Sequence, residues 1–281
     1  MSSPALGNPA WGGPSSKANF CEEDYVVTRY VAEFINSLTN LTYVFYAVYG
    51  LLQLRKKSNR DFFRALPYWG LMAVGICSAS FHVSLQYHTQ MLDDLSMLFT
   101  TTPILHQVLT VNASRHDSVL IGCALYLALA VFLVYHTITD ELLVHVLFFV
   151  GSIAVIGIRT FQLVQLRTPK HSAIRRQIWG MVRFGAFIFH LGYLVWVVDG
   201  WACDWLRQTR ATVGLPWAWA LELHGWWHIF TGIGAYTFIA VIDHLVSGTD
   251  HADLQKSFAW PTPWAAQSIF AGSQLQTLKS E

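Results

Sequence analysis

Charged residues are scarce in this chain. Asp, Glu, Lys and Arg make up 12% of its 281 residues, about half of the roughly 25% that is usual in a soluble domain. So few charges cannot cover a surface that faces water, and a soluble α/β or all-β domain is therefore disfavoured. The formal net charge of +1 provides no general attraction to nucleic acid or to an anionic surface, so no nucleic-acid partner is expected.

Cysteine is scarce as well. Four Cys residues are too few for a disulfide-rich scaffold, and none of them has the Cys-x-x-Cys spacing of a zinc ribbon. The sequence contains no visible internal repeat or low-complexity tract. The first 29 residues lack a basic stretch followed by an apolar one, so we expect no cleavable signal peptide.

Apolar residues are abundant instead, at 53% of the chain, with 12 Trp and 18 Phe. Seven stretches approach the roughly 20 apolar residues that a membrane-spanning helix needs. They lie at about 30–54, 66–85, 95–111, 118–135, 142–166, 178–198 and 216–245. The sequence therefore predicts an all-α integral membrane protein with a seven-helix transmembrane bundle over 30–246. An N-terminal segment, 1–29, precedes this bundle, and a flexible tail, 247–281, follows it.

The basic residues predict the orientation of the bundle. Twelve Lys and Arg fall in the loops after the first, third and fifth spans and in the tail, whereas four fall on the other side. By the positive-inside rule, the N-terminus is lumenal or extracellular and the C-terminus is cytosolic. An odd number of spans agrees with this orientation.

Polar residues in the predicted spans gather at one depth. His82 lies near the lumenal end of the second span, and Ser78 precedes it by one helical turn. His224 and His228 lie one turn apart where the seventh span begins, and Asp93 lies where the third begins. Three imidazoles suit Zn²⁺, which keeps a fourth position open for water in catalytic sites. The His-x-x-x-His pair lacks the Glu of an HExxH motif, so Asp93 is the predicted proton acceptor.

Each of these residues also has a structural explanation. Histidines are common at membrane interfaces, and a serine in a span often packs against a helix or bonds to its backbone. Asp93 and Asp94 could cap the N-terminus of the third span. The convergence of three histidines and a carboxylate at one depth favours the metal site.

Oxygen-bearing side chains also gather near the start of the first span. Ca²⁺ prefers six to eight oxygen ligands, so a calcium site is one hypothesis. Capping of the first helix by the acids is the other. The side chains are those of Asn19, Glu22, Glu23, Asp24 and Glu33. Cys21 and Cys203 both fall on the oxidising side of the membrane, so a disulfide between them is plausible.

These motifs resemble the alkaline ceramidase family, from about residue 11 to the seventh span. The resemblance rests on FCEEDY at 20–25, AEFIN at 32–36, LDDL at 92–95, HGWWHI at 224–229, and the Ser78-x-x-x-His82 pair. Ser-x-x-x-His with a later His-x-x-x-His also fits the wider superfamily that includes the adiponectin receptors. The acidic motif before Glu33 favours the ceramidases.

The resemblance implies an intramembrane zinc amidase that cleaves ceramide to a sphingoid base and a fatty acid. It implies zinc ligands at His82, His224 and His228, and catalytic roles for Ser78 and Asp93. It further implies a disulfide between Cys21 and Cys203, and residence in the endoplasmic reticulum or Golgi. The implied calcium ligands are the side chains of Asn19, Glu22, Asp24 and Glu33 and the backbone carbonyl of Phe20.

Three further residues have predicted roles. Trp226 and Trp227 could line a cavity for the alkyl chains of the substrate or anchor the seventh span at the interface. Asp199, near the lumenal end of the sixth span, is predicted to orient a ligand histidine through its ring N–H. The rival interpretations are a seven-helix receptor with a structural metal, an ion-coupled transporter, and a hydrolase of adiponectin-receptor type.

Overall fold

The computed structural model is all-α and describes residues 8–56, 62–247 and 254–270. Within these ranges no strand forms, and one isolated β-bridge joins Thr28 to Val31. The helices are α1 (Phe34–Thr39), α2 (Leu41–Lys56), α3 (Phe62–Ser84), α4 (Tyr87–Thr110), α5 (Arg115–Thr139), α6 (Leu142–Arg167), α7 (Ala173–Trp201), α8 (Cys203–Val213), the 3₁₀ helix η1 (Trp217–Leu221), α9 (Leu223–Ser247), α10 (Leu254–Ser257) and α11 (Thr262–Ser268).

Five of the described helices are long and apolar enough to cross a membrane: α3, α5, α6, α7 and α9. They confirm the prediction of an all-α membrane protein. The first predicted span is divided at Asn40 into α1 and α2, and α2 has 16 residues. The third corresponds to α4, whose 24 residues include Asp93, Asp94 and several threonines. Seven spans therefore stay a prediction.

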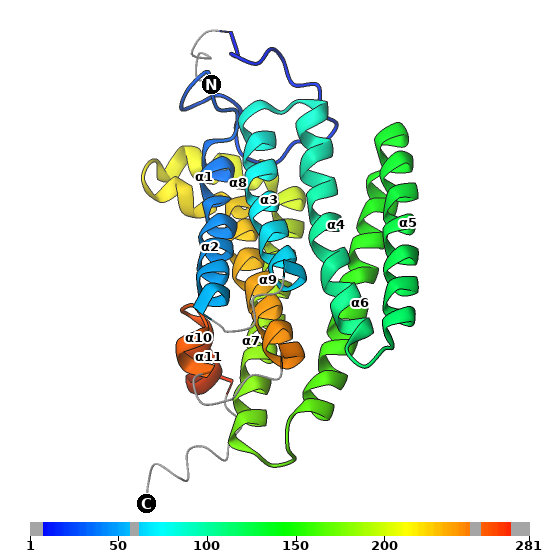
Figure 1. Ribbon diagram of the computed structural model, residues 1–281. Coiled ribbons are helices and arrows are strands. Elements are labelled where there is room, and N and C mark those ends of the chain that lie inside the picture. The colour runs from blue at the N-terminus through cyan, green and yellow to red at the C-terminus, as the bar shows by residue number, and fades with distance from the viewer. Residues whose placement is uncertain (1–7, 57–61, 248–253, 271–281) are drawn as a thin grey trace, which may run out of the picture.

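The long helices run side by side along one common direction (Figure 1). The α5–α6 hairpin lies at one side of the bundle, against α4. The segment before α1 lies across one end of the bundle together with α1 and α8, and we call this the N-terminal end. The opposite end carries α10 and α11, and we call it the C-terminal end.

Small residues let the helices of the N-terminal half approach closely, as is common in membrane bundles. A Cβ on Gly75 of α3 would lie 2.9 Å from the backbone oxygen of Asn40, and one on Gly232 of α9 would lie 3.1 Å from Thr42. The turn at Asn40 and the start of α2 are thereby held against α3 and α9. These last two helices carry the three histidines of the predicted site.

The C-terminal segment departs from the flexible tail that we predicted from residue 247. Residues 254–270 pack onto the C-terminal end of the bundle instead. The Tyr46 hydroxyl donates to the carbonyl of Trp260 (2.9 Å), and the Ala259 N–H donates to the Tyr236 hydroxyl (2.9 Å). We predicted flexibility from the polar composition of the tail, but apolar side chains within it, such as Phe258, are buried and anchor the segment.

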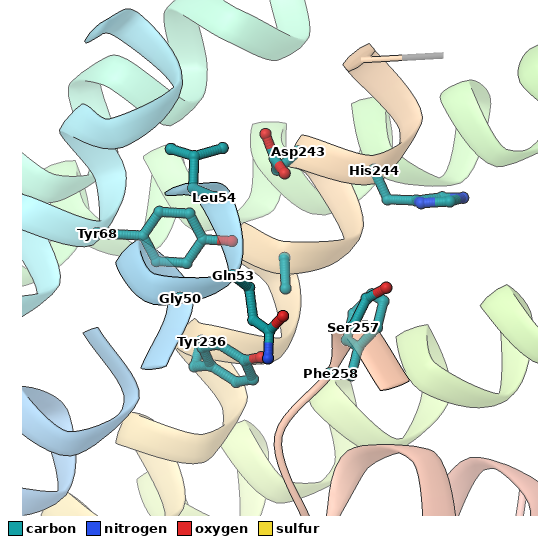
Figure 2. A pocket seen from close by; sticks show the side chains of 10 residues that line it. Gly50, Gln53, Leu54, Tyr68, Tyr236, Asp243, His244, Ser257 and Phe258 are labelled. Carbon is teal, nitrogen blue, oxygen red and sulfur yellow. The ribbon is translucent and has the colours of Figure 1, made fainter. Parts of the chain in front are cut away.

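A small pocket of about 10 Å³ lies at this end, between α2, α3, α9 and the residues after α10 (Figure 2). Tyr68, Tyr236 and Gln53 face it from one side, and Phe258 lies across from them. It has room for about one water molecule. None of the residues predicted to form the site lines this pocket.

Candidate metal centre

Three histidines meet at the N-terminal end of the bundle. His82 lies in the last turn of α3, and His224 and His228 lie in the first two turns of α9. Their ligand atoms all lie within 4.8 Å of one another, and all three side chains are buried. Among the described residues, these three form the one group of at least three His, Cys, Asp or Glu side chains that could hold a metal ion.

Two of these rings are oriented by hydrogen bonds at Nδ1. His82 Nδ1 lies 2.5 Å from the Glu33 carboxylate, and His228 Nδ1 lies 2.9 Å from the Thr39 hydroxyl. The Thr39 hydroxyl can donate its own proton to the carbonyl of Ile35 (2.8 Å), so it accepts from His228. Both contacts place a proton on Nδ1 and leave Nε2 bare, as a metal ligand requires. The Nε2 atom of His82 is buried without any hydrogen-bond partner.

The third ring, that of His224, is held from its face and its backbone. Phe20 stacks on it, with 3.6 Å between ring centroids. The His224 N–H donates to one Asp199 oxygen (3.2 Å), and the Cys21 N–H donates to the other (3.1 Å). We predicted that Asp199 would bind a ring N–H of a ligand histidine. It binds the backbone instead, because the first N–H groups of α9 have no partner within the helix and favour an anionic cap.

Ser78 and Asp93 lie together beside the histidines in the fold. Ser78 precedes His82 by one turn of α3 and is buried, and its hydroxyl lies within hydrogen-bonding reach of the Asp93 carboxyl group. Asp93 does not cap a helix, because α4 begins at Tyr87. Asp94 points elsewhere and accepts a hydrogen bond from His136 Nε2 of α5 (3.1 Å).

The acidic segment before α1 caps that helix. Both Glu22 oxygens accept backbone N–H groups, from Ile35 (2.7 Å) and from Asn36 (2.8 Å). Burial raises the pKa of Glu22 to about 7, and it also raises the pKa of Asp24, which accepts from Asn19 (3.2 Å). These contacts agree with the capping alternative. The calcium hypothesis gains no support from the described residues, since the acids form no metal group there.

A disulfide between Cys21 and Cys203 is present, as predicted. It joins the segment before α1 to the first residue of α8. The Cys21 carbonyl also accepts hydrogen bonds from Arg207 (3.0 Å) and Arg210 (2.6 Å) of α8. Phe20, which stacks on His224, is therefore fixed through its neighbour in the chain.

A cavity of about 320 Å³ lies between α2, α3, α4, α6, α7 and α9, and its lining includes Trp227, the neighbour of His228 in the chain. Most of its lining is apolar. Tyr43 and Thr231 line it near the metal centre, and the Tyr43 ring lies 6.2 Å from that of His228. Trp227 also lines the cavity, whereas Trp226 is partly exposed and donates to the Ala220 carbonyl. The two tryptophans thus occupy different environments.

Comparison with known proteins identifies the family. The family model described as "Ceramidase" matches residues 12–269. The chain belongs to the ceramidase family. It is 29% identical to alkaline ceramidase YPC1 of Saccharomyces cerevisiae over 280 residues, which cover 95% of this chain and 88% of the relative. It is 30% identical to alkaline ceramidase 3 of Mus musculus over 233 residues, covering 82% and 83%.

An alkaline ceramidase of Arabidopsis thaliana is similar at 23% identity over 233 residues, which cover 80% of this chain and 82% of the relative. The ceramidase match spans every residue of the histidine group, together with Ser78, Asp93 and the disulfide. It favours a ceramidase over the receptor and transporter interpretations.

One positioning residue of this ceramidase, Thr39, was missed by the sequence analysis. The first predicted span rests on its apolar character, but within it Thr39 and Asn40 follow Asn36 by three and four residues. This spacing places three polar side chains on one face of a helix. Such a face within an apolar stretch was the available signal for a polar site beside α1.

Proposed function

We propose that this ceramidase is a zinc-dependent amidohydrolase that cleaves the N-acyl amide of ceramide to a sphingoid base and a free fatty acid within the membrane. The observation that carries the proposal is the convergence of three buried histidines beside an apolar cavity. Three neutral imidazoles suit zinc, whereas Ca²⁺ and Mg²⁺ prefer oxygen ligands. The bare, buried Nε2 of His82 fits a metal ligand.

The ligands of the zinc ion would be His82, His224 and His228. Bound there, zinc supplies a Lewis acid that polarises an amide carbonyl and lowers the pKa of water. Glu33 and Thr39 keep two of the ligand nitrogens free of protons, and such supporting contacts raise metal affinity. The three histidines would leave a fourth position for water or substrate.

Asp93 and Ser78 carry the proton and charge chemistry. The water oxygen forms a bond to the amide carbon while Asp93 accepts the water proton, and Asp93 then gives that proton to the leaving nitrogen as the C–N bond breaks. Asp93 is thereby restored to its carboxylate form. Ser78 donates a hydrogen bond to the carbonyl oxygen while negative charge develops on it.

The cavity accommodates an alkyl chain of the substrate. Its lining includes Trp227 from α9, Phe149 and Val150 from α6 and Phe189 from α7. Val150 is also exposed, and we expect the cavity to open at this residue toward the lipid. A ceramide chain can therefore enter from the bilayer without crossing water.

The test is a joint assay of metal content and hydrolysis. Purified protein should contain about one zinc per chain and release sphingoid base from ceramide, and His224→Ala should lose both. Retention of zinc without release of sphingoid base would instead support a receptor with a structural metal. A wider series of lipid amides separates a ceramidase from a hydrolase of adiponectin-receptor type.

Calcium is a further hypothesis of the proposal. An ion bound to Asn19, Phe20, Glu22, Asp24 and Glu33 would compete with the bonds that Glu22 makes to the N–H groups of Ile35 and Asn36. Calorimetric titration of the zinc-loaded protein with calcium tests it, with Asp24→Ala as the comparison. The site would be rejected if calcium gave no heat of binding with the wild-type protein, or the same heat with Asp24→Ala.

The proposed location is the endoplasmic reticulum or Golgi membrane, with the N-terminal end lumenal and the C-terminus cytosolic. The excess of basic residues in the loops at the C-terminal end supports this orientation. The disulfide at the N-terminal end agrees with an oxidising compartment. Protease protection in sealed microsomes, read with tags at both termini, tests the orientation.

A further inference from the structure

The connection between α7 and α9 exposes several large apolar side chains, four of them tryptophans. Trp201 is 87% exposed and Trp217 is 72% exposed. The other large exposed apolar residues of this connection are Trp205, Val213, Leu215 and Trp219. Contiguous exposed apolar surface of this kind marks a site that contacts a protein or a membrane.

The helix α8 has a buried face and an exposed face, and its large apolar residues Trp205 and Val213 are exposed. Its eleven residues advance about 100° each around the helix axis. Leu206 and Arg210 are buried against the rest of the chain, and Trp205 and Val213 lie exposed on one side of that buried stripe. Ala211, about 120° from Trp205, lies exposed on the other side among polar residues.

The buried side of α8 is firmly attached to the N-terminal end of the bundle. Cys203 forms the disulfide with Cys21, and the buried Arg210 lies 2.9 Å from Glu222. Figure 1 shows α8 projecting sideways from the bundle beside α1, rather than along the direction of the long helices. The exposed Trp205 side is therefore not used for packing within the described chain.

We propose that the Trp205 side of α8, together with η1, lies in the boundary between headgroups and acyl chains of the leaflet at the N-terminal end. The occupant of this surface is the phospholipid leaflet itself. The surface is continuous with the exposed apolar face of α7, where Leu194 and Val197 lead to Trp201. Tryptophan is enriched at this depth, and amphipathic helices lie there in the plane of the membrane.

This contact links the leaflet to the metal centre. Cys203 of α8 is bonded to Cys21, whose neighbour Phe20 stacks on His224. Arg210 of α8 pairs with Glu222, two residues before that same histidine. We expect the position of α8 in the leaflet to affect how His224 is held. This coupling to turnover rests on the proposed hydrolysis, whereas the lipid contact itself does not.

The experiment measures the environment of single spin labels on the full chain in phosphatidylcholine nanodiscs. Free Cys77 and Cys123 are replaced by Ala. Labels are attached to Trp205→Cys, Trp217→Cys and, as the matched control beyond the buried stripe of α8, Ala211→Cys. Relaxation by oxygen, which partitions into lipid, is compared with relaxation by a water-soluble nickel complex. Far-UV circular dichroism and a single gel-filtration peak establish that each labelled protein is folded.

We expect oxygen to relax the labels at 205 and 217 more strongly than nickel does, and the reverse order at 211. Equal nickel access at all three positions would overturn the proposal. Low access to both reagents with spin–spin coupling between chains would also overturn it, because the surface would then bind a second copy.

The effect of α8 on turnover is measured with a separate variant. Trp205→Gln with Trp217→Gln should lower hydrolysis of bilayer ceramide several-fold at unchanged zinc content. Unchanged hydrolysis would reject the effect of α8 on turnover but not the contact between α8 and the leaflet.

Discussion

A histidine binds a metal through a nitrogen that carries no proton, so the partner of its other nitrogen decides whether the ring is ready to bind. Glu33 and Thr39 are those partners for His82 and His228. The two differ in strength, because a carboxylate accepts a stronger hydrogen bond than a hydroxyl. The weaker contact, at Thr39, is the better one to test because its removal leaves no buried charge.

Thr39→Val should weaken zinc binding by roughly 10- to 100-fold, the usual effect of losing a supporting contact to a ligand histidine. Valine keeps the volume of threonine but removes the hydroxyl that accepts from His228 Nδ1. Competition with a chromophoric zinc chelator measures the change. Thr39→Ser keeps the hydroxyl and should bind zinc as the wild type does. Equal affinity of the Val and wild-type proteins would show that Thr39 does not position the ring.

Asp93→Asn should lower kcat by about 10²- to 10⁴-fold, because the amide cannot accept the proton of the attacking water. Zinc content should stay unchanged, since Asp93 is not among the proposed ligands. Release of sphingoid base and metal analysis of the same sample measure both quantities. The neighbouring Asp94→Asn is the matched control, since Asp94 pairs with His136, and its kcat should stay within a few-fold of wild type. Loss of zinc from Asp93→Asn would make Asp93 a ligand and refute its role as a base.

The grouping of the three histidines was predictable from the sequence, because helical spacing places His224 and His228 on one face and the predicted spans place all three near one depth. The contacts of Asp199 and Glu22 were not. Both carboxylates bind backbone N–H groups at the start of a helix, and those contacts depend on the irregular path of the chain through residues 20–33. An irregular segment has no helical or strand periodicity from which its path could be predicted.

At the scale of the elements, hydropathy located the apolar part of each helix rather than the whole helix. The α4 helix begins at Tyr87, eight residues before the apolar stretch that we predicted from residue 95. Its first two turns are polar because they lie against the site and the N-terminal segment. For the same reason hydropathy marks neither the amphipathic α8 nor the segment at 254–270.

Docking of α11 on α7 requires a residue without a side chain at Gly180. A Cβ there would lie 2.6 Å from the backbone oxygen of Ala266, so Gly180→Leu should displace α11. Limited proteolysis in detergent should then remove the C-terminal segment faster than in the wild type. Gly151→Leu on α6 is the matched control, since no atom lies within 4 Å of its Cβ position. Equal cleavage of both variants would show that α11 is not held by this contact.

Zinc content should be unaffected by Gly180→Leu. The altered contact lies at the C-terminal end of the bundle, whereas the histidines lie at the N-terminal end. Loss of zinc from this variant would indicate a general failure to fold rather than local release of α11. This measurement therefore distinguishes the two causes of faster proteolysis.

For the whole molecule, the histidine group joins parts of the chain that are distant in sequence. Along the chain, His82 and His224 are separated by helices α4 to α8, and the two cysteines of the disulfide are 182 residues apart. Both links lie at the N-terminal end, so separation of α3 from α9 must break the site. A ligand that binds the folded protein and not the unfolded one stabilises it in proportion to the logarithm of its excess concentration.

Zinc should therefore raise the Tm of the metal-free protein. The free energy of unfolding should increase by about 2.7 kcal/mol when free zinc is 100-fold above its Kd. Thermal unfolding followed by tryptophan fluorescence, with and without zinc, measures this shift. His228→Ala should lose most of it, because two imidazoles hold zinc far less tightly than three, whereas Asp93→Asn should keep it. A shift of the same size in His228→Ala would mean that zinc stabilises the bundle elsewhere, and the three histidines would then not be its binding site.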